Sequence, residues 1–489
     1  MDGTQATLAL SPPGNPDIRG ITSDSRNVRP GFLFAALAGS RADGGHFVDD
    51  AVARGAVAVL TDDPARFAAL TQRTPPVHIL FDANPRRRLA RMAARFYAPQ
   101  PETLVAVTGT NGKTSVTAFT RQIWQRLGHR AASLGTIGIV GPNFEQPGAL
   151  TTPDPVTLHR ELSILARSNI DHVALEASSH GLDQFRLDGL ELSAAAFTNL
   201  TRDHLDYHRD MEAYFTAKTR LFTELLPPDG TAVLNIDSPE GERLAALCRQ
   251  RGQHILTFGA AAHADLRLVS ARPLDAGQRL SLTVLGEARD IVLPLIGAFQ
   301  ASNALAALGL AIATGAPADR AVDALTLLTG APGRLEHVAT HSNGAPVIVD
   351  YAHTPDALET VLRALRAHCR GRLVTVFGCG GDRDAGKRPQ MGAIADRLAD
   401  VVIVTDDNPR SEDPALIRRA ILAACPKAEE IADRRAAIER GVALLAPGDL
   451  LLIAGKGHER GQIVGAVTHP FDDAVVAREA VAGLRGGPP

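Results

Sequence analysis

The sequence predicts an α/β fold in which parallel β-sheets carry helices on both faces. Short apolar runs rich in β-branched residues recur along the chain, and a polar loop and often a helical pattern follow each run. The chain has 489 residues, of which 45% are hydrophobic, and it is too long for one compact core. At roughly 100–200 residues per domain, we expect about three domains.

Two changes in composition predict where the domains meet. In "FYAPQPETLVAV", two prolines separate the helix-like stretch "RRRLARMAARF" from an apolar strand, which is typical of a linker. In "LTGAPGRLEHV", Gly330, Pro332 and Gly333 separate an alanine-rich helical stretch from the strand "PVIVDY". The predicted domains are therefore residues 1–98, 99–331 and 332–489.

The predicted strands lead into polar loops. The middle region contains the runs "TLVAV", "HVALEA", "AAAFTNL" and "TAVLNI", and the last region contains "PVIVDY", "RLVTVFG", "DVVIVTD" and "DLLLIAG". Ligands of parallel sheets bind beyond the carboxyl ends of the strands, so these loops should carry the chemistry. In "HTPDALETVL" we expect a structural role instead, with Thr354 capping a helix, Pro355 in its first turn and Asp356 beside them.

Composition excludes several classes of protein. Lys and Arg number 51 against 54 Asp and Glu, so the chain has no field that would attract nucleic acid or an anionic membrane. The four cysteines are scattered and suggest neither a disulfide framework nor a metal site. The N-terminus lacks the pattern of a signal peptide, and the apolar run 304–313 is too short to span a bilayer. We expect a cytoplasmic, monomeric protein.

The stretch "VAVTGTNGKTSVTAF" predicts a phosphate-binding loop. Residues 105–107 form the strand, and Val116, Phe119, Ile123 and Leu127 follow at helical spacing until Gly128. A helix N-terminus offers unpaired N–H groups to a phosphate, while the lysine of "GKT" can reach the outer phosphates of ATP and the threonine can ligate Mg²⁺. The broad P-loop pattern has a glycine where this chain has valine, and an ordinary glycine-rich turn is the alternative. The predicted ATP-binding loop comprises Gly109, Thr110, Asn111, Gly112, Lys113, Thr114 and Ser115.

This variant of the loop, TGTNGKT, resembles that of the Mur ligases, the ATP-dependent enzymes that form amide bonds in peptidoglycan precursors. The resemblance continues through "SDSRNVRPGFLFAAL" and "GSRADGGHF", then "TTPDP", "EASSHGL", "NLTRDHLDYH" and "YFTAK", and finally "PGRLE", "DYAHTPD", "GGDRDAGKRP", "DDNPRSE" and "GKGHE". It implies a smaller α/β N-terminal domain that binds UDP, a central P-loop ATPase domain with a parallel sheet, and a Rossmann-like C-terminal domain that binds the incoming amino acid.

The chemistry of such a ligase explains several charged residues. A carboxylate must be activated before an amine can attack it, and transfer of the γ-phosphoryl group gives an acyl phosphate. Metal ions and cationic side chains must neutralise the oxygens that meet there. Glu176 and His204 are candidates for the Mg²⁺ shell together with Thr114, although His204 could also simply pack or cap within its loop. Lys113 would stabilise the moving phosphoryl group.

Other nucleotide contacts are implied mainly by the resemblance. Lys218 would otherwise be read as a solvated helix lysine, but the family implies a carbamate on its side chain that holds a second Mg²⁺. Asn303, which we expect just before a helix as a possible cap, would face the adenine. Arg334, otherwise a linker arginine, would contact the phosphates, and Asp350 at the end of a strand suits a ribose hydroxyl.

The same resemblance assigns the two remaining substrates. The residues expected to bind UDP and the muramoyl dipeptide are Ser23, Ser25, Ser40, Arg41, Ala42, Thr151, Thr152, Ser178, Gln184 and Arg186. Arg41 stands where an amide side chain is expected. The residues expected to bind diaminopimelate are Arg383, Asp407, Asn408, Pro409, Arg410, Gly455 and Glu459. A planar guanidinium such as that of Arg410 can grip a carboxylate through two hydrogen bonds, and Glu459 suits an ammonium group.

Within the family, "DNPR" indicates the member that adds meso-2,6-diaminopimelate to UDP-N-acetylmuramoyl-L-alanyl-D-glutamate with ATP and Mg²⁺. We expect domain closure to exclude water from the acyl phosphate. Three alternatives remain open. A lysine-adding Mur ligase would differ in the amino-acid pocket, a folylpolyglutamate-synthase-like ligase should lack "DNPR" and so large a UDP domain, and a non-catalytic P-loop switch would need neither Lys218 nor an amino-acid site.

Overall fold

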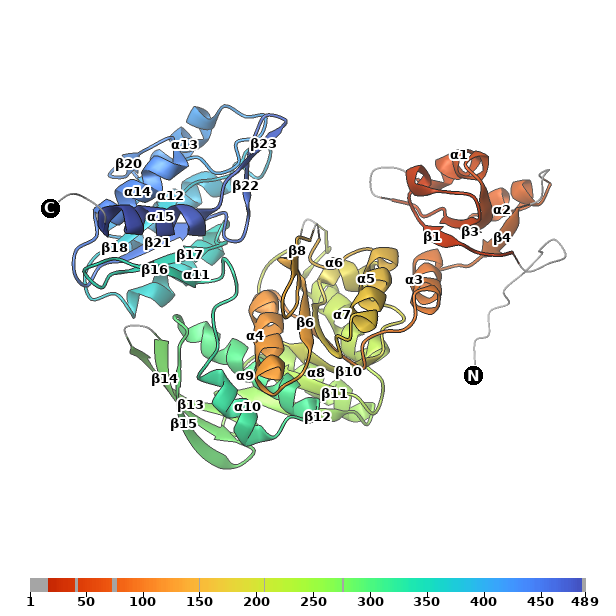
Figure 1. The fold of residues 1–489 in the computed structure, drawn as a ribbon, viewed down its shortest axis with the longest axis horizontal. Coiled ribbons are helices and arrows are strands. Elements are labelled where there is room, and N and C mark those ends of the chain that lie inside the picture. The colour runs from red at the N-terminus through yellow and green to blue at the C-terminus, as the bar shows by residue number, and fades with distance from the viewer. Residues whose placement is uncertain are drawn as a thin grey trace. The chain divides into compact units, whose positions relative to one another are not determined.

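The fold is mixed α/β, as the sequence predicts. The computed structural model describes residues 16–39, 43–72, 77–148, 150–205, 207–274 and 277–485 (Figure 1). The chain divides into two compact units. The first comprises the chain up to Lys113 with Gly128–Val233 and Glu240–Ile255, and the second comprises Thr114–Leu127, Leu234–Pro239 and the chain from Leu256.

The first unit begins with a four-stranded parallel sheet. Its strands, in spatial order, are β1 (Gly20–Thr22), β2 (Phe32–Ala35), β3 (Ala56–Thr61) and β4 (His78–Phe81). Alternate side chains of a strand face opposite sides, so Phe34 and Val59 join one core while Leu33 and Leu60 join another. The associated helices are α1 (Val48–Ala53), α2 (Pro64–Thr71) and α3 (Pro85–Phe96).

A larger sheet carries the predicted phosphate-binding loop. It has eleven strands in the order β15-β14-β13-β12-β11-β10-β5-β9-β6-β7-β8. The parallel strands at its middle are β10 (Leu192–Phe197), β5 (Thr103–Thr108), β9 (His172–Glu176) and β6 (Ala131–Gly135). The remaining elements of this region are β7 (Gly138–Val140), β8 (Glu145–Gln146), α5 (Pro155–Arg167), α6 (Ser179–Asp183), α7 (Met211–Arg220), β11 (Thr231–Asn235), α8 (Pro239–Gln250) and β12 (His254–Gly259).

Both ends of this sheet are antiparallel, which the sequence did not lead us to expect. At one end β7 pairs antiparallel with β6 and with β8. β13 (Leu266–Leu274), β14 (Gly277–Val284) and β15 (Glu287–Leu293) form a meander. Helices α9 (Ala298–Ala313) and α10 (Ala318–Leu325) follow in the chain.

The helix after the phosphate-binding loop is α4 (Lys113–Arg126), and Gly128 follows it with φ +97°, as the sequence predicts. It buries Val116, Phe119 and Ile123. It also buries Trp124, whose Nε1 donates a hydrogen bond of 3.0 Å to Thr314 Oγ1 just beyond α9.

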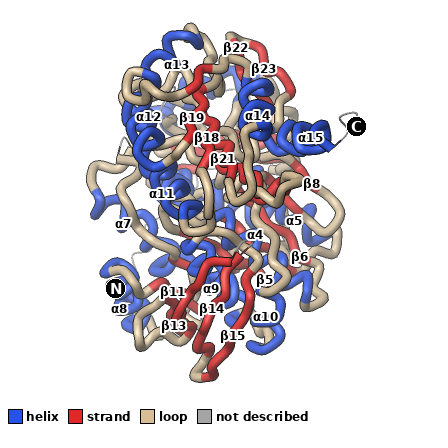
Figure 2. Tube along the Cα trace, turned by 90° about the vertical axis from the view of Figure 1, so that its left-hand side faces the viewer, coloured by secondary structure: helices blue, strands red, loops and turns tan. Residues whose placement is uncertain are grey.

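The C-terminal sheet has the order β16-β17-β21-β18-β19-β20 and is parallel except for β16. Figure 2 shows α11 and α12 on one side of its strands and α14 and α15 on the other, which agrees with the two separate cores of this sheet. The elements are β16 (Glu336–Thr340), β17 (Pro346–Asp350), α11 (Pro355–Arg366), β18 (Leu373–Phe377), α12 (Lys387–Leu398), β19 (Val401–Val404), α13 (Pro414–Leu422), β20 (Glu429–Glu430), α14 (Arg434–Ala443), β21 (Leu450–Ala454), β22 (Gly461–Val464), β23 (Val467–Pro470) and α15 (Asp473–Arg485).

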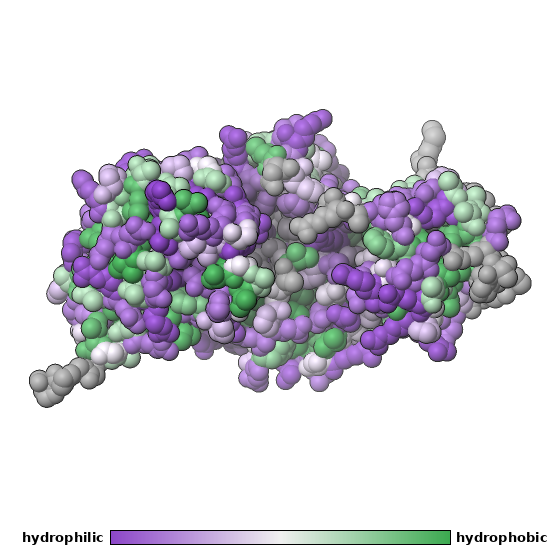
Figure 3. Space-filling view, turned by 90° about the horizontal axis from the view of Figure 1, so that it is seen from above, coloured by the Kyte–Doolittle hydropathy of each residue, from purple (hydrophilic) through white to green (hydrophobic). Residues whose placement is uncertain are grey.

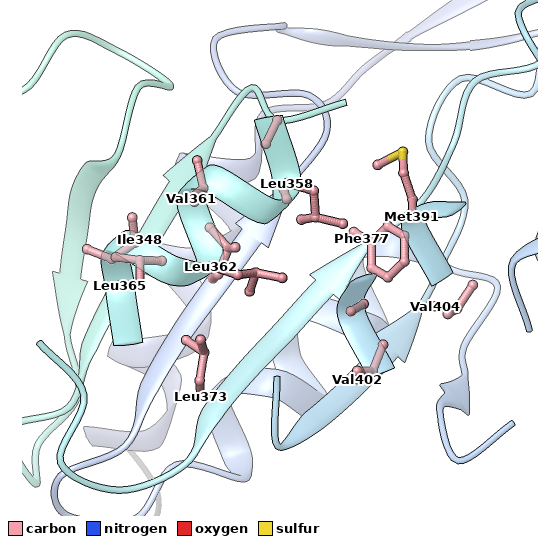
Figure 4. Packing of buried hydrophobic residues seen from close by; sticks show 14 of the residues in the cluster. Ile348, Leu358, Val361, Leu362, Leu365, Leu373, Phe377, Met391, Val402 and Val404 are labelled. Carbon is pink, nitrogen blue, oxygen red and sulfur yellow. The ribbon is translucent and has the colours of Figure 1, made fainter. Parts of the chain in front are cut away.

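Helix α11 shows how sequence pattern becomes packing. Leu358, Leu362 and Leu365 recur at helical spacing and point toward Leu373 and Phe377 of β18 (Figure 4). Burying each such side chain contributes roughly 1.5–3 kcal/mol. The helix begins as predicted, because Thr354 Oγ1 accepts the Ala357 N–H at 3.4 Å and proline occupies the first position.

The surface is largely hydrophilic. The face visible in Figure 3 is mainly purple, with small scattered green areas. Among the helices that the structure describes, none has both the length and the apolar character needed to cross a bilayer.

Candidate active site

The predicted phosphate-binding loop joins the end of β5 to the start of α4. Gly109 has φ +145°, and a Cβ atom there would lie 2.0 Å from Thr198 Oγ1. A side chain would therefore be strained and would clash, which explains why glycine stands at this position.

Residues after β10 hold the loop from the other side. Thr198 Oγ1 donates to the Asn111 carbonyl oxygen at 2.6 Å, and Asn199 Oδ1 accepts the Asn111 N–H at 3.0 Å. The Thr110 N–H donates to the Asn199 carbonyl at 2.9 Å. We did not select Thr198 or Asn199 from the sequence, although both lie in the motif region "TNLTRDHLDYH". Their position after a strand was the signal available.

The structure brings the two predicted lysines to one carbonyl oxygen. Lys113 Nζ lies 2.9 Å and Lys218 Nζ 2.8 Å from the Gly109 oxygen, and Lys113 also donates to the Thr110 carbonyl at 2.8 Å. Lys218 is only 1% exposed, so it does not lie on a solvated helix face. Burial, and then the charge of Lys113, hold the pKa of Lys218 well below its usual value. Both effects favour the neutral amine of Lys218 more than solvent would.

Tyr214 completes the surroundings of Lys218. Its ring centre lies 4.4 Å from Lys218 Nζ, and its hydroxyl lies 3.2 Å from Thr110 Oγ1. Burial raises the pKa of Tyr214 to about 12, so the hydroxyl keeps its proton and can donate a hydrogen bond. We did not select this tyrosine from the sequence, although it belongs to the quoted "YFTAK".

Glu176 lies buried at the end of β9. Its Oε1 accepts the Thr136 N–H at 2.8 Å, and its Oε2 accepts the Thr136 hydroxyl at 3.1 Å. Thr136 follows β6, the strand beside β9, and we did not select it from the sequence. These two bonds fix the carboxylate of Glu176 against the loop that follows β6.

His204 occupies an irregular position after β10. Its backbone has φ +54°, its side chain is 43% exposed, and its Nε2 lies 3.5 Å from Asp203 Oδ2. Its ring makes an edge contact with that of His180, with the ring centres 4.9 Å apart. The contact with His180 covers only part of the imidazole, and a ligand can therefore reach the ring.

Residues predicted to bind the dipeptide form one hydrogen-bonded group. Thr152 Oγ1 donates to the Glu176 carbonyl at 2.8 Å and accepts the Ser178 N–H at 3.0 Å. Arg186 donates from Nη1 to the Thr152 carbonyl and from Nη2 to Gln184 Oε1, each at 2.7 Å. Burial lowers the pKa of Arg186. Ser178 has a structural function as well, because its Oγ caps α6 through the Gly181 N–H at 3.0 Å.

Thr151 joins the same region through a 2.9 Å contact between its hydroxyl and that of Thr136. Further toward the N-terminus, Ser23 is exposed and Ser25 is buried at the start of a 3₁₀ turn. The predicted positions Ser40, Arg41 and Ala42 lie outside the described residues.

The predicted nucleotide contacts of the second unit need one correction. Asn303 does not precede a helix, because α9 begins at Ala298 and Gly297 is its N-cap residue. Asn303 is buried inside that helix, where its Nδ2 donates to Gln300 Oε1 at 2.9 Å. The helix begins earlier than expected because Gly297, with φ +98°, provides the turn that starts it.

Arg334 and Asp350 both lie beside the segment that follows β17. The Arg334 guanidinium lies 4.6 Å from the centre of the Tyr351 ring. Asp350 Oδ2 accepts the Leu335 N–H at 2.7 Å, and its Oδ1 accepts the Ala352 N–H at 2.8 Å. Burial raises the pKa of Asp350 despite these bonds and the nearby Arg334. Asp350 thus fixes the backbone around Arg334, whatever ligand it also contacts.

The predicted amino-acid residues lie in loops at the carboxyl ends of β18, β19 and β21. Arg410 has φ +52° and donates from Nη1 to the Gly381 carbonyl at 2.8 Å, which leaves other guanidinium donors for a ligand. Arg383 is exposed. Asp407 is buried, which raises the pKa of its carboxyl group, and a Cβ at Gly455 would lie 2.5 Å from Asp407 Oδ2.

Asn408 and Glu459 lie in contact, with Asn408 Nδ2 donating to Glu459 Oε2 at 2.8 Å. Pro409 is buried between Asn408 and Arg410. The loops that carry "DNPR" and "GKGHE" are therefore in direct contact, through Asn408 with Glu459 and through Asn408 with Lys456. Lys456 belongs to the motif "GKGHE", but we did not select it from the sequence as a binding residue.

Family comparisons agree with a fold that combines a P-loop sheet and a separate C-terminal parallel sheet. The Mur ligase family, catalytic domain, matches residues 17–97, and the Mur ligase middle domain matches residues 107–311. The Mur ligase, glutamate ligase domain, matches residues 333–457. The chain belongs to the Mur ligase family and is a ligase.

Within the family, the chain is similar over nearly its whole length to ligases of one name. The UDP-N-acetylmuramoyl-L-alanyl-D-glutamate--2,6-diaminopimelate ligase of Agrobacterium fabrum is 52% identical over 98% of this chain and 96% of its own length. The ligase of the same name from Caulobacter vibrioides is 52% identical over 96% of both chains. A solved structure of a ligase with that name has a TM-score of 0.72 at 35% identity, covering 96% of each chain.

A folylpolyglutamate synthase of known structure shares the fold. The Mycobacterium tuberculosis folylpolyglutamate synthase complexed with ADP has a TM-score of 0.63 at 20% identity, covering 83% of this chain and 95% of its own. At that identity the likeness concerns the fold alone.

Proposed function

We propose that this protein joins meso-2,6-diaminopimelate to the D-glutamate of UDP-N-acetylmuramoyl-L-alanyl-D-glutamate, using ATP, in the cytoplasmic synthesis of peptidoglycan precursors. The observation that carries the proposal is the near-complete overlap, at 52% identity, with ligases named for this reaction. The loops at the strand ends also support it. One is a glycine-rich turn at the start of a helix, and others carry Arg383 and Arg410, which suit the carboxylates of an amino acid.

The reaction proceeds through an acyl phosphate. ATP binds at the loop 109–115, where Lys113 neutralises charge as the γ-phosphoryl group moves to the D-glutamate carboxylate. ADP leaves, and the amine of diaminopimelate attacks the acyl carbon and displaces phosphate. Asn303, Arg334 and Asp350 serve the nucleotide, and the group around Thr152 and Arg186 holds the dipeptide.

Mg²⁺ fits the donor set on chemical grounds. Glu176 is a buried hard-oxygen donor, and Thr114 is a buried hydroxyl at the start of α4. Thr114, Glu176, His204 and the modified Lys218 would hold the ions. When bound, Mg²⁺ would neutralise the phosphate and carboxylate oxygens.

Carbamylation of Lys218 is part of the proposal. A neutral amine attacks CO₂ and loses a proton, giving an anionic carbamate with two oxygen donors. The burial of Lys218 and its lowered pKa support this reaction, because they favour the neutral form. The modification would also place an anionic group near the Lys113 ammonium.

One assay separates the candidate functions. Phosphate release from ATP is measured with UDP-muramoyl dipeptide, with and without diaminopimelate, and the product is identified by mass spectrometry with lysine present as a competitor. We expect phosphate release to depend on both the dipeptide and diaminopimelate. We also expect the product to contain diaminopimelate. A lysine product would favour the lysine-adding alternative, dependence on a folate substrate would favour a folylpolyglutamate synthase, and no turnover would favour a switch.

A further inference from the structure

Lys456 is the centre of a buried polar cluster next to the predicted amino-acid pocket. Its side chain is 0% exposed. Its Nζ lies 3.0 Å from Asn408 Oδ1 and 3.1 Å from Glu459 Oε2. A lysine is rarely buried this completely unless its charge is paired, so the two acceptors account for its position.

These contacts fix the orientation of the Asn408 amide. Asn408 Oδ1 accepts hydrogen bonds from Lys456 and from the Ile463 N–H at 2.9 Å, while Nδ2 donates to Glu459 Oε2 at 2.8 Å. The amide therefore presents its oxygen to two donors and its nitrogen to a carboxylate. Without Lys456, Oδ1 would keep one donor, and Glu459 would lose its cationic partner.

The backbone around the cluster is equally constrained. Gln462 Nε2 donates to the Asp407 carbonyl at 2.7 Å, which ties the segment after Glu459 to the "DNPR" loop. Arg410 N donates to the Ile463 carbonyl at 3.1 Å. Lys456 thus adds a side-chain link between two loops that also meet through their backbones.

The charges suggest why a cation is needed here. Diaminopimelate has a carboxylate beside each of its ammonium groups. An unpaired Glu459 would attract the ammonium but repel the neighbouring carboxylate, whereas Lys456 offsets part of that repulsion. Glu459 can then bind an ammonium group of diaminopimelate, while Arg410 and Asn408 bind one of its carboxylates.

We propose that Lys456 is a positioning residue for the incoming amino acid, holding the Asn408 amide and the Glu459 carboxylate in the arrangement that binds it. This inference rests on the proposed function. Lys456 need not touch the amino acid, since it acts through Asn408 and Glu459.

The test is steady-state kinetics of Lys456→Met, which keeps the length of the side chain and removes the ammonium. Two charge-assisted hydrogen bonds are lost, so the KM for diaminopimelate should rise roughly tenfold to a hundredfold. The KM values for ATP and the UDP-linked dipeptide should stay within about twofold, because the cluster belongs to the amino-acid loops. Lys456→Gln, which retains a hydrogen-bond donor, should have an intermediate KM.

Lys427→Met is the matched control, because Lys427 is exposed in the same domain. It should leave all three KM values unchanged. Wild-type protein that releases phosphate without regard to diaminopimelate would refute the proposed function itself. If wild type is diaminopimelate-dependent, an unchanged KM in Lys456→Met, or equal increases for all three substrates, overturns the positioning role. Failure of both Lys456 variants to fold would overturn it too, in favour of a purely structural lysine.

Discussion

The two lysines that share the Gly109 carbonyl differ in their surroundings. Lys113 is half buried and belongs to the phosphate-binding loop, whereas Lys218 is buried beneath it in α7. Two ammonium groups at one oxygen repel each other, and the buried one gives up its proton more easily. The pair therefore separates into a cation that can meet phosphate and an amine that can be modified.

Replacing Lys113 by alanine should nearly abolish turnover without unfolding the protein. The substitution removes the positive charge on which the moving phosphoryl group depends. Phosphate release measures the loss, and circular dichroism checks the fold. Lys427→Ala, at an exposed position, should retain full activity. Near-normal ligation by a folded Lys113→Ala protein would refute the phosphate role.

Lys218→Ala should be severely impaired, and short carboxylic acids should restore part of its activity by supplying the missing oxygens. Wild-type activity should fall when CO₂ and bicarbonate are removed and should recover when they return. Mass spectrometry provides a second readout, once the carbamate on Lys218 has been trapped under CO₂. The carbamate hypothesis fails if wild type is indifferent to CO₂ and Lys218→Ala remains active.

Arg410→Ala should lower kcat/KM for diaminopimelate by roughly tenfold to a hundredfold, because a charge-assisted hydrogen bond is worth about 1.5–3 kcal/mol. Lysine lacks the distal carboxylate, and its kcat/KM should fall much less. Arg419→Ala, which changes an exposed arginine of α13, should affect neither. A wild type that prefers lysine, or equal losses with both amino acids, would show that Arg410 does not read the distal carboxylate.

At the scale of single elements, α5 contains a pH-sensitive residue. His159 is 1% exposed, its Nε2 lies 3.1 Å from the Asp188 carbonyl, and its Nδ1 has no hydrogen-bond partner among the described residues. Burial lowers the pKa of His159 to about 4, against 6.5 in an unfolded chain. Between these values the unfolded state binds more protons, so the free energy of unfolding decreases as the pH falls.

Wild-type protein should therefore lose roughly 3 kcal/mol of stability through His159 between pH 7 and pH 4, most of it below pH 6.5. Urea denaturation across this range measures the change. His159→Gln keeps a donor for the Asp188 carbonyl but does not titrate, so its stability should vary less with pH. Parallel pH profiles for the two proteins would contradict this assignment.

The strand pattern was predictable where strands are buried on both faces. Runs such as "TLVAV" and "DLLLIAG" became β5 and β21, because continuous β-branched and leucine stretches suit the centre of a parallel sheet. The meander β13 to β15 was not predicted, because polar residues such as Arg267, Ser270 and Arg272 interrupt the apolar residues of β13. Asn303 was misplaced because the alanine-rich helix α9 has no polar N-cap residue to mark its start.

The candidate site was predictable as motifs rather than as contacts. Lys113 and Arg410 stand in recognisable loops, so a function could be predicted for each from residue type and spacing, and both functions stay predictions. Thr136 and Tyr214 could not be selected, because their functions depend on which strand lies beside β9 and which ring lies beneath Lys218. Pairing between strands far apart in sequence decides such contacts, and local pattern does not encode it.

For the molecule as a whole, the predicted boundaries at residues 98/99 and 331/332 remain a prediction. The cores of the C-terminal sheet come mostly from residues after 332. Among the described core residues, Ile296 and the partly buried Phe299 come from earlier in the chain.

A fragment of residues 332–489 should consequently fold alone and unfold cooperatively in urea, with lower stability than a fragment beginning at residue 294. Restoring Ile296 and Phe299 should add a few kcal/mol, since burying each side chain contributes roughly 1.5–3 kcal/mol. Circular dichroism during denaturation compares the two. A fragment 332–489 without cooperative unfolding would place the third domain's boundary earlier than residue 332.

The buried indole in α4 gives the protein its own optical reporter. Trp124 is the one tryptophan in the sequence, and it lies in the helix that begins at Lys113. Its bond to Thr314 ties it to the end of α9, the helix that contains Asn303. All indole fluorescence thus originates at one site, about three helical turns from Lys113. Nucleotide titrations can follow that emission without a dye, a label or an engineered residue.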